Sequence, residues 1–220
     1  MNYIENIFIC LAAPILFVIV CVRGRRPKAS MTFVFLGMTA CLLSSYISTF
    51  AAAAMGVNAS IASTDIAPFV EEIMKFLPVL FFIAVFEPSK ISALNCIIMV
   101  SAGFATLENV CYLIENGASS ITHLAVRGFG TGAMHVVCGM IVAWGIYYLW
   151  DRAYLRTAGT VGLVASAIAY HGIYNVLVSQ QGIPAYIGYL IPLFTVVLVF
   201  RVSARIRENE KEAHKIQENA

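Results

Sequence analysis

Seven side chains suited to acid–base or metal chemistry lie inside long apolar stretches of this chain. They are carboxylates, an amine, imidazoles and an amide, and in chain order they are Glu71, Glu72, Lys75, Glu108, His135, His171 and Asn175. A charge at the centre of a bilayer costs about 2.5–3.5 kcal/mol on insertion scales, so such residues normally face a protein interior and serve a function. We therefore expect these side chains to mark a functional site.

Two imidazoles and one carboxylate form the ligand set of many catalytic zinc sites, in which water fills the open position. The metal lowers the pKa of that water to about 7, and a separate carboxylate can then act as general base. We predict Glu108, His135 and His171 as ligands of Zn²⁺ or another divalent metal. Glu71 or Glu72 would supply the base or a fourth ligand. The reaction that such a set supports is hydrolysis of a peptide bond inside the membrane.

Helical spacing gives expectations for the remaining two side chains. On a helix at 100° per residue, Lys75 projects between Glu71 and Glu72. The i,i+4 spacing favours Glu71 as its partner, which leaves Glu72 as the carboxylate nearer the reaction. Asn175, one turn from His171, is expected to orient that imidazole or to stabilise an oxyanion.

The composition indicates the elements that must position these residues. The chain is 60% hydrophobic and 12% charged, with a mean hydropathy of +0.83, whereas soluble domains carry about 25% charged residues. These values indicate an all-α, polytopic membrane protein. A helix needs about 20 mainly apolar residues to cross a bilayer, and seven stretches qualify: 4–22, 31–55, 66–86, 91–115, 124–150, 158–179 and 184–203. We expect residues 1–203 to form one catalytic bundle and residues 204–220 a polar cytoplasmic tail.

The basic residues predict how this bundle is oriented. Of the 14 Lys and Arg residues, all except Lys75 and Arg127 fall in the first, third and fifth connections or in the C-terminal tail. In a seven-span bundle these segments share one side of the membrane. Because cytoplasmic loops are enriched in Lys and Arg, we expect the N-terminus outside and the C-terminus in the cytoplasm. The expected partners are the lipid bilayer and a single-pass membrane substrate, with no nucleic acid.

The depths of the candidate residues in their spans are similar. At 1.5 Å per residue, Glu72, Glu108, His135 and His171 all lie roughly 9–12 Å below the outer surface. A shared depth predicts one site in the outer half of the bilayer. Three other interpretations remain open: the same site without metal, with Glu72 and His171 as an acid–base pair; a proton relay in a carrier; and a non-catalytic immunity or scaffold protein.

Four short motifs occur in order between Pro68 and Asn175. They are Glu71-Glu72-x-x-Lys75, Phe104-x-x-x-Glu108-Asn109, His135, and His171-x-x-x-Asn175. The ordered set resembles the PrsW family of intramembrane proteases, which is related to the CAAX prenyl endopeptidases and to bacteriocin-immunity membrane proteins. CAAX-type enzymes typically carry Arg at the position of Lys75 and His at that of Glu108, so these two residues place the chain with PrsW and disfavour a prenylated substrate.

The resemblance also implies a substrate and a location. It implies cleavage of a membrane-anchored anti-sigma factor on its extracytoplasmic side (site-1 cleavage), which releases a stress-response sigma factor in bacteria. The chain would then be a multi-pass protein of the bacterial cytoplasmic membrane. The expected outer depth of the site agrees with that side. The motifs do not decide between a metal and a mechanism that uses glutamates alone.

Overall fold

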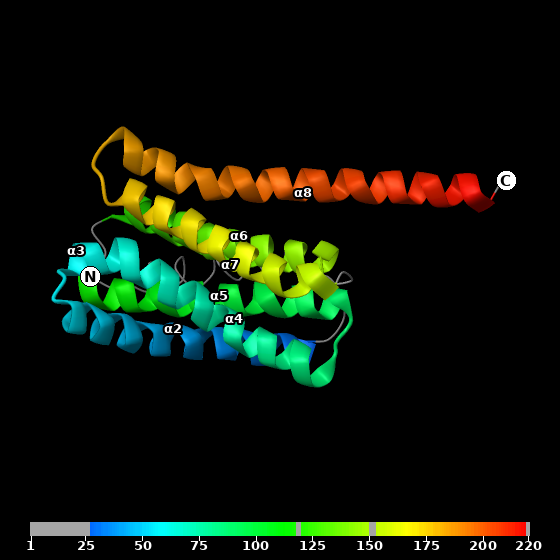
Figure 1. The fold of residues 1–220 in the computed structure, drawn as a ribbon. Helices are drawn as coiled ribbons and strands as arrows, with labels where there is room; N and C mark the ends of the chain where they lie inside the picture. Colours follow the sequence, from blue (N-terminus) through cyan, green and yellow to red (C-terminus); the bar gives the residue numbers. More distant parts are fainter. Residues whose placement is uncertain (1–26, 118–119, 150–152, 219–220) are drawn as a thin grey trace.

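The computed structural model describes residues 27–117, 120–149 and 153–218, and every regular element within these ranges is helical (Figure 1). The expected all-α class is therefore confirmed. The first expected span, at 4–22, lies outside the described residues, and so does the start of the first basic connection.

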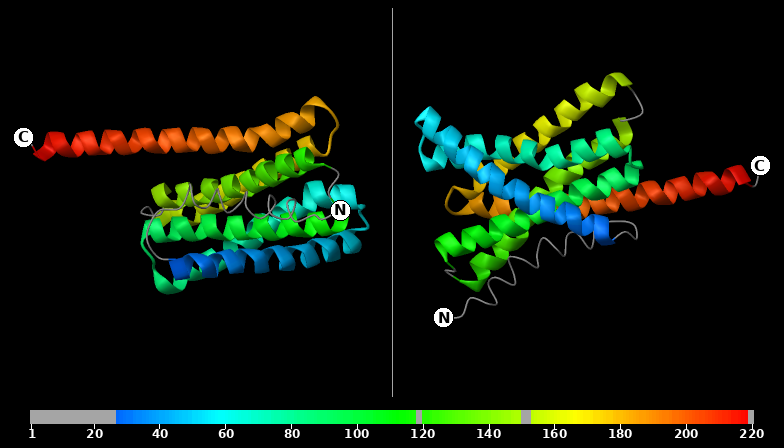
Figure 2. Two further views of the ribbon diagram at one scale, coloured as in Figure 1. Left: turned by 180° about the vertical axis from the view of Figure 1, so that it is seen from behind. Right: turned by 90° about the horizontal axis from the view of Figure 1, so that it is seen from below.

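Six long helices and a short helical linker make up the described chain. The long helices are α2 (Pro27–Met55), α4 (Ala67–Phe86), α5 (Lys90–Asn116), α6 (Ile121–Leu149), α7 (Ala153–Val178) and α8 (Ile183–Glu218). The linker consists of α3 (Ala59–Ile61) and the π-helical turn η1 (Ala62–Ile66). Successive long helices reverse direction and form an up-and-down bundle, in which α8 packs against α6 and α7 (Figure 1, Figure 2).

Five of the described helices, α2, α5, α6, α7 and α8, are long and apolar enough to cross a membrane. They correspond to the expected spans that start at residues 31, 91, 124, 158 and 184. Helix α4 is 20 residues long, but it contains Glu71, Glu72 and Lys75, and this density of charge separates it from the other five. The structure supports a multi-pass membrane protein, whereas the total of seven spans remains a prediction.

Helices α5 and α6 form the centre of the bundle. In the most apolar 18-residue stretch of each, 67% and 78% of residues are buried, compared with 28% in the corresponding stretch of α2 and 17% in those of α7 and α8. Helix α2 approaches α5 at two glycines: a Cβ on Gly37 would lie 2.0 Å from the Val100 carbonyl oxygen, and one on Gly103 would lie 2.0 Å from that of Val34. Small residues allow backbones to approach this closely, and the contact fixes the helix that carries Glu108.

The connection expected at 56–65 is largely helical. Gly56, with a φ of +65°, ends α2. Asn58 then caps α3 by accepting a hydrogen bond from the Ile61 N–H at 2.9 Å. The chain continues through η1 directly into α4, so Glu71 lies about one turn inside that helix.

The polar C-terminal segment continues the last helix. The apolar part of α8 ends at Arg201, and the helix runs on to Glu218, clear of the bundle (Figure 1). It is therefore a helical extension of the last apolar span.

Candidate active site

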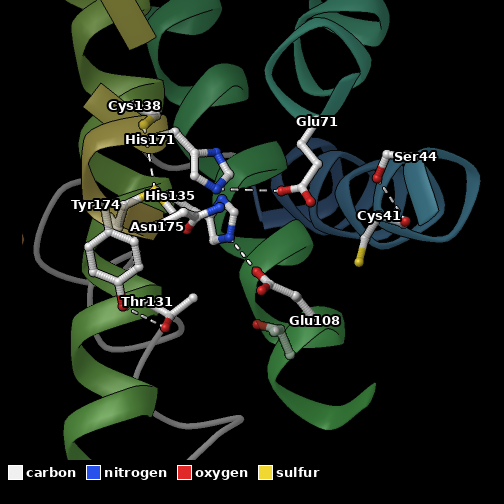
Figure 3. A network of polar contacts seen from close by, with 12 residues as sticks. Cys41, Ser44, Glu71, Glu108, Thr131, His135, Cys138, His171, Tyr174 and Asn175 are labelled. Carbon is white, nitrogen blue, oxygen red and sulfur yellow. Dashed lines mark hydrogen bonds and ion pairs between the residues drawn. The ribbon is translucent and has the colours of Figure 1, made fainter. Parts of the chain in front are cut away.

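The side chains that the sequence predicts as functional come together where α4, α5, α6 and α7 face one another (Figure 3). The two imidazole rings, on α6 and α7, have centroids 5.0 Å apart and are nearly perpendicular, at 86°. His135 contacts Glu108 through Nε2, and His171 contacts Glu72 through Nδ1 at 2.8 Å. The four helices therefore build one site, as the shared depth of these residues predicts.

The site has a closed part and an open part. The two imidazoles, Glu72 and Lys75 are at most 5% exposed. By contrast, the side chains of Glu71 and Glu108 are 17% and 30% exposed. These two carboxylates therefore form the more exposed edge of the site.

Lys75 is paired with Glu72 and not with Glu71, so the expectation from i,i+4 spacing is wrong. Its Nζ atom lies 2.6 Å from Glu72 Oε1 and 3.0 Å from His135 Nδ1. It also lies 5.1 Å from the centroid of the Phe104 ring. The i,i+3 pair prevails because it lets one buried ammonium serve an acceptor on its own helix and another on α6.

His171 and Glu71 face each other across a gap. Nδ1 of His171 lies 2.8 Å from Glu72 Oε1, so this nitrogen carries the proton and donates it to the carboxylate. The Nε2 lone pair is then left 3.8 Å from Glu71 Oε2, and that oxygen is buried without a hydrogen-bond partner. Two acceptors that face each other in this way need a proton, a water or a cation between them. Glu71, rather than Glu72 as expected, is the carboxylate with a free oxygen.

His135 lies between a cation and a carboxylate. Because Lys75 Nζ contacts its Nδ1, that nitrogen accepts, and the Nε2–H donates to Glu108 Oε2 in a short hydrogen bond. The other oxygen of Glu108 accepts from Arg127 Nη2 at 3.3 Å. Arg127 is a residue of the site that the sequence analysis did not include. A comparison of backbone depths places it two turns above His135 and takes no account of how far a guanidinium reaches.

Asn175 has a partner other than the two expected. Its amide donates to the carbonyl oxygen of Ser63 in η1 at 2.8 Å, which ties α7 to the segment just before α4. The neighbouring Tyr174 forms a 2.8 Å hydrogen bond with Thr131 of α6. Helix α7 is therefore tied to a neighbour on each side close to His171. Ser63 could not be found from the sequence, because it falls in an expected loop.

Glu71, His135 and His171 form a group that fits a metal ion. One ligand atom from each lies within 4.8 Å of the others. Tetrahedral Zn²⁺, with bonds of 2.0–2.1 Å, needs ligand atoms roughly 3.3 Å apart, so a modest closure would suffice. Each imidazole has a carboxylate at one ring nitrogen, the arrangement typical of metal-ligating histidines. Glu108, which the sequence predicts as a ligand, is not in this group. Its carboxylate contacts Nε2 of His135.

With Glu71 ionised and both imidazoles neutral, the formal charges of the site would leave one negative charge uncompensated. Lys75 neutralises Glu72, and Arg127 neutralises Glu108. With neutral imidazoles the excess charge rests on Glu71, whose Oε2 is the oxygen without a hydrogen bond. A cation bound beside Glu71 would remove this excess, and so the donor set and its charge both suit a divalent metal.

Comparison with known families identifies the family to which this chain belongs. The model of the PrsW family intramembrane metalloproteases matches residues 26–202, a range that contains every site residue described above. The chain belongs to this family and is an intramembrane protease, which confirms the resemblance seen in the motifs. Comparison with curated proteins and with solved structures gives no significant match. Membership in a protease family indicates hydrolysis rather than proton-coupled transport or a scaffold role.

Proposed function

We propose that the chain is a metal-dependent endopeptidase that holds one divalent cation, Zn²⁺ by preference, between Glu71, His135 and His171. The observation that carries this proposal is the buried Oε2 atom of Glu71, which has no hydrogen-bond partner and lies 3.8 Å from His171 Nε2. A cation would satisfy the free oxygen of Glu71 and the Nε2 lone pair of His171 at once. The description of the family as metalloproteases agrees with it.

The other residues of the site would hold this centre in place. When bound, the cation would supply a water with a pKa near 7 and would polarise the scissile carbonyl. Glu72 accepts the Nδ1–H of His171 and so directs Nε2 toward Glu71. Lys75 neutralises Glu72, which keeps that carboxylate from acting as a second base. The exposed edges of Glu71 and Glu108 leave an approach for the substrate backbone.

One contact favours a version of the site without metal. Lys75 Nζ lies 3.0 Å from His135 Nδ1 and takes the lone pair that a cation would use. In this version a water between Glu71 Oε2 and His171 Nε2 gives its proton to Glu71 as it attacks the substrate carbonyl. Both versions depend on Glu71, and they differ in their response to a chelator.

We also propose that the site faces the extracytoplasmic half of the bilayer. Glu108 and His171 lie about two turns before the ends of α5 and α7, and Glu71 lies about one turn inside α4. These three helix ends share one end of the bundle (Figure 1). The connections at that end contain no Lys or Arg, whereas Lys90 and Arg156 lie at the opposite end. The family resemblance adds an anti-sigma factor as the single-pass substrate and the bacterial cytoplasmic membrane as the location.

Cysteine labelling tests this orientation. In a variant whose native cysteines are replaced by alanine, a membrane-impermeant maleimide added from outside should label Ser60→Cys and should miss Glu210→Cys. Position 60 lies in α3 at the end without basic residues, and position 210 lies in the extension of α8. The reverse pattern would refute both the orientation and the extracytoplasmic site.

Cleavage by the purified chain tests the activity and its metal dependence together. In liposomes, the chain should cut a single-pass anti-sigma factor near the outer edge of its span, with the cut identified by mass spectrometry of the fragments. A strong chelator should stop the reaction and Zn²⁺ should restore it. A cut in the cytoplasmic half would refute the proposed side. Unchanged cleavage in chelator would select the version without metal.

A further inference from the structure

Arg127 and Tyr112 lie outside the group suited to a metal, yet they are built against it. The Nη2 of Arg127 donates to Glu108 Oε1 at 3.3 Å. Its guanidinium carbon lies over the ring of Tyr112, 3.4 Å from the centroid. The Nε atom of this guanidinium is buried without a hydrogen-bond partner. A side chain that is only 14% exposed is held here by a carboxylate and a ring face.

Glu108 needs such an anchor because of where it lies. Its side chain is 30% exposed, and a carboxylate with three free torsions at an open edge would otherwise be hydrated and mobile. Its two oxygens have different partners: Oε1 accepts from Arg127, and Oε2 accepts from His135. Holding both oxygens fixes the position and the plane of the carboxylate.

His135 is in turn fixed by Glu108. Its ring is fully buried, and its Nε2–H donates to Glu108 Oε2. A carboxylate at one ring nitrogen determines which nitrogen keeps the proton and leaves the other, Nδ1, as the one with a lone pair. In the structure this Nδ1 contacts Lys75 on the inner side of the site.

We propose that Arg127, held on the ring of Tyr112, is a positioning residue for the protease reaction that acts through Glu108 on His135. Glu108 is then an outer partner of an imidazole ligand and not itself a ligand, and Arg127 does not contact substrate. The part of this proposal that concerns metal affinity rests on the proposed metal centre. The part that concerns the rate applies equally to a site without metal, because His135 needs the same orientation there.

Metal affinity and steady-state kinetics test this role in the purified full-length chain. Arg127→Met should bind Zn²⁺ about 10–100-fold more weakly and should lose a similar factor in kcat with little change in KM. Arg127→Lys, which keeps the charge but stacks less well on a ring, should recover part of that loss. Tyr112→Leu should show a smaller loss in the same direction. Arg201→Met, at the far end of the apolar part of α8, is the matched control and should behave as wild type.

A double-mutant cycle separates this role from a structural one. If Arg127 acts only through Glu108, then Arg127→Met should cause no further loss of kcat in a Glu108→Gln background. Losses that multiply in the double variant, or a raised KM with unchanged kcat, would overturn the inference. If wild type binds Zn²⁺ tightly and Arg127→Met has the same affinity for Zn²⁺, the inference would be overturned as well. A wild-type chain that binds no Zn²⁺ would instead refute the proposed metal centre, and the kcat cycle would still decide the role of Arg127.

Discussion

Replacing Glu71 with glutamine is expected to lower kcat/KM by a factor on the order of 10³ while leaving the fold intact. Glu71 Oε2 is the free carboxylate oxygen beside His171, so either version of the mechanism loses its metal ligand or its base. The fold should tolerate the change because a glutamine amide can donate to His171 Nε2 and removes the uncompensated charge. The measurements are cleavage of a defined single-pass substrate and thermal unfolding in detergent. Glu115→Gln, an exposed change near the end of α5, is the matched control.

Glu72→Gln should lower the stability of the protein as well as its activity. Glu72 Oε1 contacts both Lys75 and His171, so the substitution leaves the buried Lys75 ammonium without its counter-charge. We expect a less stable protein whose activity falls by about 10–100-fold, because His171 loses the carboxylate that orients it. A stable, inactive Glu72→Gln beside an active Glu71→Gln would reverse the assignment and restore the one favoured by helical spacing.

Lys75→Met is expected to remove about 3–5 kcal/mol from the free energy of unfolding. The Lys75 ammonium is buried against Glu72 Oε1 at 2.6 Å and against His135 Nδ1 at 3.0 Å. Methionine fills a similar volume, so the loss would come from the uncompensated carboxylate and not from a cavity. Denaturant unfolding of the purified chain in detergent measures it.

The double variant Lys75→Met/Glu72→Gln provides the control for that loss. Removing both charges of a buried pair is often neutral, so most of the stability should return. Activity should stay low, because His171 Nδ1 no longer meets a charged carboxylate. A single Lys75→Met variant as stable as wild type would show that the ion pair with Glu72 contributes nothing to folding.

The convergence of the site could be predicted from the sequence for a physical reason. A charged or imidazole side chain in an apolar span must find partners inside the protein. Helical rise converts sequence position into depth, so Glu108 and His171 could be assigned to one level before their helices were placed. Helix lengths and short connections supply the rest of the all-α arrangement.

The pairings inside the site could not be predicted in the same way. Lys75 reaches both Glu71 and Glu72 along its own helix, and the choice depends on His135 and His171, which belong to other helices. A spacing rule has no access to those neighbours. The sequence therefore identifies the group of ionisable residues, and only the packing of α6 and α7 against α4 decides which carboxylate keeps a free oxygen.

Two further differences between the sequence prediction and the structure arise from the reach of a side chain and from local backbone structure. Arg127 has a backbone well above His135, but its guanidinium extends to Glu108. The stretch 59–66 lacks the apolar pattern of a span, yet it forms α3 and η1, and Ser63 there accepts from Asn175. Neither contact leaves a periodic signal in the sequence.

The metal content of the purified, active chain tests the proposed centre most directly. Elemental analysis should find about one zinc per chain, as expected for one catalytic site. Glu71→Gln and His171→Gln should lose both the metal and the cleavage of a defined anti-sigma substrate, whereas Glu115→Gln should keep both. Wild-type protein that cleaves this substrate at full rate without any bound divalent metal would contradict the metal centre and leave Glu71 and His171 as an acid–base pair.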